Sequence, residues 1–209
     1  MILQTLNGQI IDNPKIKNLT VIWNGSNSKV ILHEPVNFLG KCQFILTDDN
    51  VVEIKGTHHH IRDLDVRTMS KHSELHIGED LSCNGCTVYY DIPNQKIHIG
   101  KDCMFAFDII IWPDDGHAIL DIHTKQVINR SNPETIIGNH VWVTRGVNII
   151  KNTVISDNCI IGMHSIVSKP FAEKNSVIAG VPAKIVKSGI TWTRKNSFEY
   201  DTSILTKRN

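Results

Sequence analysis

Aliphatic residues recur at every sixth position in the second half of the chain. The series runs without a break through Ile137, Val143, Ile149, Ile155, Ile161 and Val167. Four residues after each of these lies a second, mostly small or β-branched set: Val141, Val147, Thr153, Cys159, Ser165 and Phe171. A period of six fits neither an α-helix nor the alternation of a lone strand; it indicates a short strand plus a tight turn, forming one side of a triangular coil. Three hexads complete a coil, so residues 137–172 predict two regular coils.

The same repeat recurs in a less regular form upstream. Hexads are visible in two further runs: Ile77/Cys83/Tyr89 and Ile99/Phe105/Ile111. We therefore expect irregular coils over residues 15–111, with protrusions at residues 57–71 and 112–132. Strand-forming runs at residues 21–23 and 29–32 fit either early coils or an ordinary hairpin.

These elements predict an all-β protein, with a parallel β-helix over residues 1–187 and a C-terminal cap over residues 188–209. A solenoid must be capped because its last coil would otherwise expose an apolar end. The tail after residue 187 has no hexad and carries Trp192, Phe198 and Tyr200. We expect it to fold over the open end or against a neighbouring subunit.

Composition and charge narrow the range of partners. The 209 residues, 41% of them hydrophobic, suffice for one domain with its own core. Lys and Arg total 22 against 21 Asp and Glu, so no global field recruits nucleic acid or an anionic membrane. No apolar run approaches the ~20 residues of a membrane span, and the start lacks the basic and apolar regions of a signal peptide. We expect a cytoplasmic protein.

The cysteines and most histidines favour structural roles. Five cysteines at scattered spacings suggest no disulfide framework, and we expect them to be reduced. Cys83 and Cys86 form a lone C-x-x-C without a second pair, which favours two coil residues over a zinc or redox site. His58–His60 cannot all face one ion from a strand, so a loop tip is the favoured interpretation. We assign no metal site.

Three motifs give the chain a family resemblance. They are Ile-Ile-Gly-Asn-His-Val-Trp-Val at 136–143, Ile-Ile-Gly-Met-His-Ser-Ile-Val-Ser-Lys at 160–169 and Val-Ile-Ala-Gly-Val-Pro-Ala-Lys at 177–184. On these residues the chain resembles the hexapeptide-repeat acyltransferases, a family that includes galactoside, maltose and sialic-acid capsule O-acetyltransferases. The resemblance implies a left-handed β-helix, and a homotrimer with three sites between neighbouring subunits. It also implies acetyl transfer from acetyl-CoA to a hydroxyl of a carbohydrate acceptor, such as a surface polysaccharide.

Acetyl transfer to a hydroxyl requires a general base, and His117 is the candidate. Histidine side chains, with a pKa of ~6.5 in peptides, are mostly neutral at pH 7 and accept a proton. In the resembled family a Gly-His about twenty-five residues before a Val-Trp supplies this base, and His117 and Trp142 reproduce that spacing. Asp115, Asp114 or a backbone carbonyl would orient the imidazole. Trp142 is expected to wall the site, and Asn84 and Trp112 to contact the acceptor.

The resemblance also implies a set of residues that contact the cofactor. They are Arg145, Met163, Ser168, Lys169, Lys184 and Lys187. The cations among them suit the nucleotide phosphates of coenzyme A. Met163 departs from the small residue that is common at its position, and it either narrows the slot or simply packs.

Two other functions stay open at this point. An N-acyltransferase of an amino sugar or nucleotide-linked sugar needs the same base, but the chain has no Gly-rich dinucleotide-binding fingerprint. A non-catalytic trimeric scaffold has no need for His117, Trp142, Ser168, Lys169 and Lys184 together. These residues therefore favour the O-acetyltransferase. The sequence does not identify the sugar.

Overall fold

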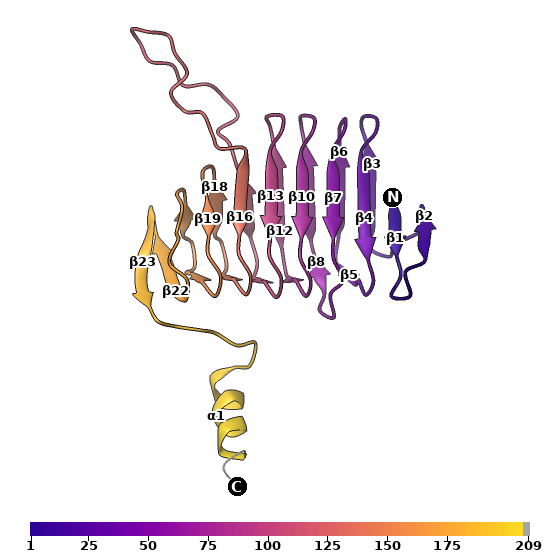
Figure 1. The fold of residues 1–209 in the computed structure, drawn as a ribbon, viewed down its shortest axis with the longest axis vertical. Helices are drawn as coiled ribbons and strands as arrows, with labels where there is room; N and C mark the ends of the chain where they lie inside the picture. Colours follow the sequence, from indigo (N-terminus) through magenta and orange to yellow (C-terminus); the bar gives the residue numbers. More distant parts are fainter. Residues whose placement is uncertain (207–209) are drawn as a thin grey trace.

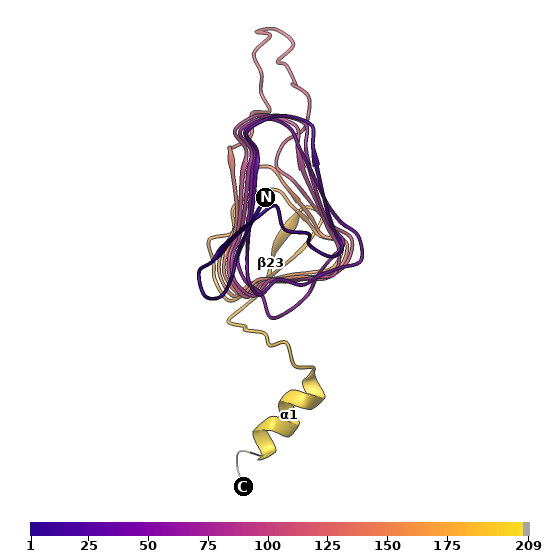
Figure 2. The ribbon, with the colours of Figure 1, turned by 90° about the vertical axis from the view of Figure 1, so that its right-hand side faces the viewer.

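The computed structural model describes residues 1–206. Its short strands stack into three sheets that form the sides of a triangular prism (Figure 1, Figure 2). Each turn of the chain passes through sheet A, then sheet C, then sheet B, and we name the corners A–C, C–B and B–A after the sheets they join. The predicted parallel β-helix is therefore confirmed.

The strands divide almost evenly among the three sheets. Sheet A contains β1 (Ile2–Gln4), β2 (Ile10–Asp12), β4 (Lys29–His33), β7 (Val51–Ile54), β10 (Glu74–Ile77), β13 (Lys96–Ile99), β16 (Glu134–Ile137) and β19 (Val154–Ile155). Sheet C contains β5 (Phe38–Leu39), β8 (Ile61–Arg62), β11 (Ser82–Cys83), β14 (Met104–Phe105), β17 (Trp142–Val143), β20 (Ile160–Ile161), β22 (Ser176–Gly180) and β23 (Ala183–Ser188). Sheet B contains β3 (Leu19–Trp23), β6 (Cys42–Leu46), β9 (Leu64–Thr68), β12 (Cys86–Tyr90), β15 (Ile109–Trp112), β18 (Asn148–Ile150) and β21 (Ile166–Val167). Among the strands of the described residues, only the terminal pairs β1–β2 and β22–β23 are antiparallel.

The core is a stack of inward side chains that follows the hexad pattern. All six positions of the aliphatic series are at most 1% exposed. Register places Ile137 beside Ile155 in sheet A, and Val143 beside Ile161 in sheet C. Each such side chain contributes roughly 1.5–3 kcal/mol by leaving water. The two regular coils predicted over residues 137–172 are therefore confirmed.

The corners explain the Asn, Asp and Gly residues between the apolar positions. At the A–C corner, five residues have φ of 54–59°: Asp80, Asp102, His140, Asn158 and Asn175. Asn and Asp tolerate this left-handed conformation better than most residues. Glycine is needed where coils approach closely, since a Cβ on Gly100 would lie 2.6 Å from the carbonyl carbon and oxygen of Gly138.

Two expectations for the N-terminal half are wrong, and one open choice is decided. Residues 57–71 form no protrusion comparable to the arm, because β8 and β9 occupy residues 61–62 and 64–68 and the buried Thr57 hydroxyl donates to the Leu81 carbonyl oxygen. Tyr89, expected in a hexad, faces outward, and its neighbours Val88 and Tyr90 are buried instead. The runs at 21–23 and 29–32 belong to β3 and β4, which pair in parallel with later coils and form no hairpin with each other.

The cysteines are core residues. All five are free and buried, including Cys83 and Cys86 in β11 and β12. Burial raises the pKa of Cys83 and Cys103 to about 12. The prediction that they are unpaired coil residues is confirmed.

A long loop between β15 and β16, which we call the arm, leaves the prism at the B–A corner (Figure 1). Leu120 and Val127 form a bridge across it, and the Asp121 carboxylate accepts hydrogen bonds at its turn. Ile119, Leu120 and Ile122 are 50–73% exposed. The protruding loop predicted over residues 112–132 is confirmed.

The C-terminal cap is β23, which crosses the end of the prism (Figure 2). Residues 188–209 are expected to form the cap, but their described part leaves that end and runs along the A–C corner. There the Trp192 ring stacks on His140 at 4.0 Å between centroids, and Arg194 donates to the Asp102 carboxylate at 2.9 and 3.1 Å. Helix α1 (Ser197–Thr206) then points away from the prism (Figure 1). No helix in the described residues is long and apolar enough to cross a membrane.

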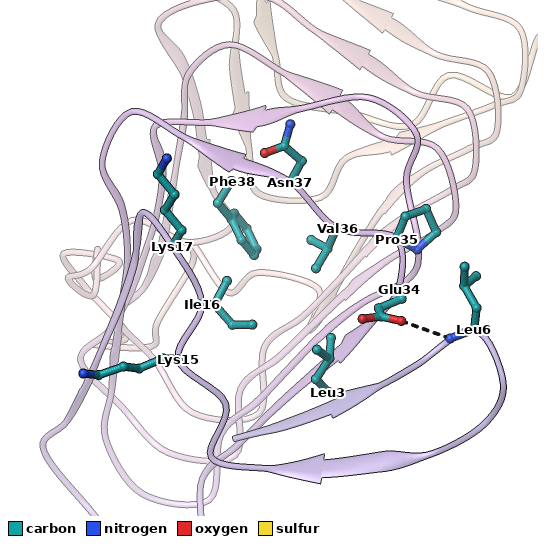
Figure 3. Close-up of a pocket in the computed structure, with 10 residues that line it drawn as sticks. All are labelled: Leu3, Leu6, Lys15, Ile16, Lys17, Glu34, Pro35, Val36, Asn37 and Phe38. Atoms are coloured by element: carbon teal, nitrogen blue, oxygen red, sulfur yellow. Dashed lines mark hydrogen bonds between the residues drawn. The ribbon is translucent and has the colours of Figure 1, made fainter.

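The N-terminal end of the prism is only partly covered by the β1–β2 hairpin. It leaves a pocket of ≈ 380 Å³ with apolar side chains such as Leu3, Ile16 and Phe38 in its wall (Figure 3). A hydrogen bond of 3.2 Å from the Leu6 amide to the Glu34 carboxylate closes one side. None of the predicted site residues lines this pocket.

Candidate active site

His117 lies at the base of the arm with its side chain exposed. Its backbone is fixed: the amide donates to the Asp115 carbonyl oxygen at 2.8 Å, and its carbonyl oxygen accepts from Asn129 Nδ2 at 2.8 Å. Within the described residues, no hydrogen bond engages the imidazole itself. A shallow pocket of ≈ 180 Å³ lies beside it, lined by residues that include Ile92 and Arg130. The ring is therefore presented to a ligand with both nitrogens available.

Neither neighbouring carboxylate orients that ring in the single chain. Asp115 accepts hydrogen bonds from Lys151 Nζ and from Asn129 Nδ2, and the Lys151 bond is the main cause that lowers its pKa. Asp114 accepts from the Gly116 amide at 2.6 Å, while its second oxygen is buried without a partner and burial raises its pKa. Asp115, predicted to act on the imidazole, instead ties the arm to the coil.

Asn84 and Trp142 share the outer face of sheet C. The register runs from Ser82 through Met104 to Trp142, so Asn84 lies two coils from Trp142 and on the same side. Asn84 Oδ1 is 2.9 Å from His60 Nε2, and Asn84 borders a groove of ≈ 420 Å³ at the C–B corner. The half-buried Trp142 ring lies 6.1 Å from that of Trp192, so the tail packs against it.

Five of the six predicted cofactor residues fall on two different edges of the prism, and Lys187 lies on β23 toward the A–C corner. Arg145 and Met163 occupy successive C–B corners, where the His164 amide donates to the Arg145 carbonyl oxygen at 3.0 Å. On β23, Lys184 pairs with Ala179 of β22 near this edge, and Lys187 pairs with Val177 of β22. Ser168 and Lys169 instead follow β21 at the B–A corner.

The charges on these edges differ in their availability. The Arg145 guanidinium donates to Asp108 at 2.9 Å and lies 5.7 Å above the Phe107 ring. The Lys169 ammonium lies 5.5 Å above the Phe171 ring. Lys184 and Lys187 are exposed and have no ion-pair partner among the described residues. These lysines suit phosphate groups, so the chemistry of the edges fits a nucleotide-bearing thioester.

Sheet B separates the two edges. One edge carries His117, Ser168, Lys169 and Trp112; the other carries Asn84, Arg145, Met163 and Lys184. A five-residue strand spans about 17 Å at ~3.3 Å per residue, so one chain does not bring the two sets together.

Sequence reasoning missed the residues that hold these groups in place. Lys151 and Asn129 fix the base of the arm, but in the sequence they look like ordinary turn residues. Trp112, predicted to contact the acceptor, donates its indole N–H to Asp91 at 3.0 Å, and nothing in the sequence signals that partner. Arg194 reaches Asp102 from 92 positions away, and no local pattern connects them.

No family model matches the chain. Two curated relatives are polysialic acid O-acetyltransferases: one from Escherichia coli O1:K1 / APEC is 39% identical over 104 residues, and one from Neisseria meningitidis is 36% identical over 112 residues. These matches span about half of this chain (50% and 53%) and 33% and 52% of the relatives. The chain thus matches only a third to a half of the length of these relatives.

Solved structures extend the likeness to nearly the whole chain. The polysialic acid O-acetyltransferase OatWY is 30% identical with a TM-score of 0.64, over 90% of this chain and 99% of that one. The polySia-specific acetyltransferase NeuO is 27% identical with a TM-score of 0.65, over 92% of each chain.

The prism, the arm and the two polar edges define a hexapeptide-repeat β-helix protein. With the full-length likeness to OatWY, the chain belongs to the hexapeptide-repeat acyltransferase family. Within that family, the likeness to the two polysialic acid acetyltransferases OatWY and NeuO covers 90% and 92% of this chain.

Proposed function

We propose that the protein is an acetyl-CoA-dependent O-acetyltransferase that acetylates a hydroxyl of a carbohydrate, such as a surface polysaccharide containing sialic acid. The observation that carries this proposal is the likeness to the polysialic acid O-acetyltransferase OatWY, which covers 99% of that chain at 30% identity. The exposed imidazole of His117 at the arm base supports it, because an acceptor hydroxyl can reach the ring there.

The chemistry follows from the available imidazole. Acetyl-CoA supplies an activated acetyl group as a thioester. His117 takes the proton from the acceptor hydroxyl as its oxygen attacks the acetyl carbonyl carbon, and the carbon–sulfur bond then breaks. The imidazolium returns the proton to the departing thiolate, so the transfer needs no covalent enzyme intermediate. Lys169, Lys184 and Lys187 would bind the nucleotide phosphates.

We also propose that the active protein is a homotrimer with shared sites. The two edges of one chain are about 17 Å apart across sheet B, but cyclic packing places the B–A edge of one copy beside the C–B edge of the next. Three equivalent grooves then form, each containing His117 from one copy and Arg145, Met163 and Lys184 from its neighbour. The exposed aliphatic residues of the arm would be covered in this assembly.

A thiol-release assay tests the function directly. The purified protein is given acetyl-CoA with a panel of acceptors: monosaccharides, maltooligosaccharides and oligomers of sialic acid, with amino sugars as N-acceptors. We expect thiol release that depends on a hydroxyl acceptor, and base-labile acetyl esters in the product. Release only with amino sugars would indicate N-acylation. A stable trimer that binds acetyl-CoA but acetylates nothing in the panel would support the scaffold.

Mixed oligomers test the shared site. His117→Ala alters the B–A edge, and Met163→Trp combined with Lys184→Glu alters the C–B edge. After subunit exchange we expect partial activity from mixtures of these two variants, because some grooves then combine two intact edges. A matched mixture of His117→Ala with Ser168→Trp alters one edge twice and should stay inactive. Equal behaviour of both mixtures, after verified exchange, would contradict the shared site.

A further inference from the structure

The chain after β23 returns along the A–C corner of the prism as a segment, residues 190–194, which we call the strap (Figure 1). The Ile190 amide donates to the Asn175 carbonyl oxygen at 2.9 Å, and Asn175 Nδ2 donates to the Ile190 carbonyl oxygen at 3.1 Å. Two corners further along the prism, the Trp192 indole N–H donates to the His140 carbonyl oxygen at 2.8 Å. The strap is therefore bound to corners of different coils.

Arg194 fixes the far end of the strap. Its Nε and Nη2 atoms donate to the Asp102 carboxylate at 3.1 and 2.9 Å, and its Nη1 atom donates to the Ser82 hydroxyl at 2.7 Å. The Nη2 atom also donates to the carbonyl oxygens of Asp80 and Cys103, both at 3.2 Å. The planar guanidinium thus joins two coils with several hydrogen bonds, which limits the movement of the strap.

The strap buries a large apolar side chain, Trp192, which is 8% exposed. Its ring stacks on His140 at 4.0 Å and 10°, and the Arg194 guanidinium lies 5.8 Å from its centroid. The His140 ring is held in turn, because Nδ1 lies 2.6 Å from the Asp102 carboxylate and Nε2 lies 3.2 Å from the Trp192 carbonyl oxygen. The Trp192 indole therefore has a fixed position and a fixed support.

The Trp192 ring packs against Trp142, the residue predicted to wall the active site. The two centroids lie 6.1 Å apart, and the ring planes meet at 47°. Trp142 points outward from sheet C, where register places it between Met104 and Ile160 of the neighbouring coils. These two residues flank Trp142 along the prism axis, and Trp192 flanks it on the side of the A–C corner.

The proposed trimer puts the outer face of sheet C into the shared groove. When the C–B edge of one copy lies beside the B–A edge of the next, sheet B faces the symmetry axis, and sheet C of one copy faces sheet A of the next across the groove. Trp142 then lies in the groove wall. The A–C corner points away from the axis, so the strap borders the groove without entering the contact between copies.

We propose that Trp192 is a positioning residue for the acceptor: the strap holds the Trp142 indole in the groove wall, and Trp142 in turn orients the sugar whose hydroxyl reacts. This inference rests on the proposed function and on the proposed trimer. Tryptophan presents a broad apolar face that packs on the C–H face of a sugar. A small displacement of such a wall misaligns the reacting hydroxyl and costs turnover.

A double-mutant cycle tests whether Trp192 acts through Trp142. Trp192→Ala should lower kcat/KM for the acceptor by about tenfold, because the wall is misplaced, and change the Michaelis constant for acetyl-CoA little. Trp192→Phe keeps an aromatic ring and should recover most of the loss. In a Trp142→Ala background, Trp192→Ala should have little further effect, because the residue that it positions is already gone.

Two further variants separate positioning from general packing of the tail. Arg194→Gln removes the guanidinium bonds without changing either indole, so it should reproduce part of the loss in kcat/KM. Phe198→Ala truncates an aromatic residue that is 79% exposed on α1, beyond the strap, and should behave as wild type. Thermal melts verify that the coils of every variant are folded.

Time-resolved fluorescence anisotropy tests the strap without any acceptor. In a Trp23→Phe, Trp112→Phe background, Trp142 is the remaining indole once Trp192 is replaced by Phe or Ala. We expect restricted motion of Trp142 in the Phe variant and faster local motion in the Ala variant. This readout reports the hold on Trp142 directly, and it needs no catalysis.

The failures of the two proposals are distinguishable. Wild-type kcat/KM in Trp192→Ala, an equal loss from Trp192→Ala with and without Trp142, or equal motion of Trp142 in the Phe and Ala variants would each overturn the positioning role. The proposed function fails separately if no acceptor causes thiol release. The anisotropy would then still decide whether the strap holds Trp142.

Discussion

The coils and the arm are built on different principles. In the coils each inward side chain is supported by its counterparts in the coils before and after, as Phe105 is by Cys83 and Val143. The arm has one bridge in its length and exposes its aliphatic residues, and a few polar contacts at Lys151 and Asn129 fix its base. The comparison teaches that folding free energy resides in the coils, whereas the placement of the proposed base depends on the arm. Substitutions should therefore separate stability from activity.

The largest expected effect is loss of the proposed base in the arm. His117→Ala should reduce turnover by about 10²–10⁴-fold, as is typical for loss of a general base. Its melting temperature and acetyl-CoA affinity should stay unchanged, because the side chain is exposed and, within the described residues, no hydrogen bond engages its ring. Steady-state kinetics measures the turnover, and calorimetry measures the melting temperature and the acetyl-CoA affinity. Wild-type turnover on the true acceptor would remove His117 from the mechanism.

The converse substitution in the coils should affect stability alone. Phe105 is 1% exposed, and Phe105→Ala should lower the free energy of unfolding by about 3–5 kcal/mol. Denaturant unfolding measures the loss. The folded fraction should keep near-normal turnover, and a selective loss of turnover without loss of stability would contradict the division between coil and arm.

A smaller effect is expected where the two regions meet. Lys151→Met removes the ammonium that binds Asp115 and the Asn129 carbonyl oxygen, so the arm base loosens. Turnover should fall about tenfold from misplacement of His117, with little change in stability because a single ion pair near the surface contributes at most ~1 kcal/mol. Lys174→Met, which removes a comparable pair with Asp157, is the control. If both variants lose activity equally, the arm base has no special role.

Substitutions at the prism edges should change the Michaelis constant for acetyl-CoA rather than turnover. Lys169→Glu and Lys184→Glu should each raise the Michaelis constant for acetyl-CoA several-fold, because phosphate contacts bind ground and transition states alike. The difference in Michaelis constant between variant and wild type should shrink when the acetyl thioester of dephospho-CoA replaces acetyl-CoA. Lys41→Glu, at the C–B corner between β5 and β6, is the matched control and should behave as wild type. Unchanged saturation in both test variants would assign these lysines another purpose.

The smallest effect concerns the charged side chains on the outer face of sheet A. The hydrogen bond from the Lys55 ammonium holds the pKa of Glu53 at about 2, below the usual 4.5. A lowered pKa stabilises the folded state above pH 4.5, and this contribution is lost as the pH falls toward 2. Glu53→Gln should therefore be less stable than wild type at neutral pH, by about 1 kcal/mol, and the difference should vanish near pH 2. Exposed Glu173→Gln should show no such convergence in melts across this range.

The sequence by itself determined the coils, the position of the arm and the identity of the candidate base. A six-residue repeat is a local signal: it fixes which side chains face inward, and it ends where the chain leaves the coil before His117. The expectations that were wrong lie where the repeat is weak, as at residues 57–71 and at Tyr89. There the corner lengths vary, and spacing alone does not reveal the inward side.

Only the tertiary structure decided how residues far apart in the sequence meet. Asp115 binds Lys151 rather than the imidazole, Arg194 crosses to Asp102, and Trp112 packs against Tyr89 from the neighbouring coil. It also divided the predicted cofactor residues between two edges of the prism. The physical reason is that residues one coil apart become neighbours through strand register, and the number of residues in each corner and in the arm sets that register. Local propensity does not reveal that register, because it depends on the added lengths of all the corners in a coil. Only the folded coil shows which residues become neighbours.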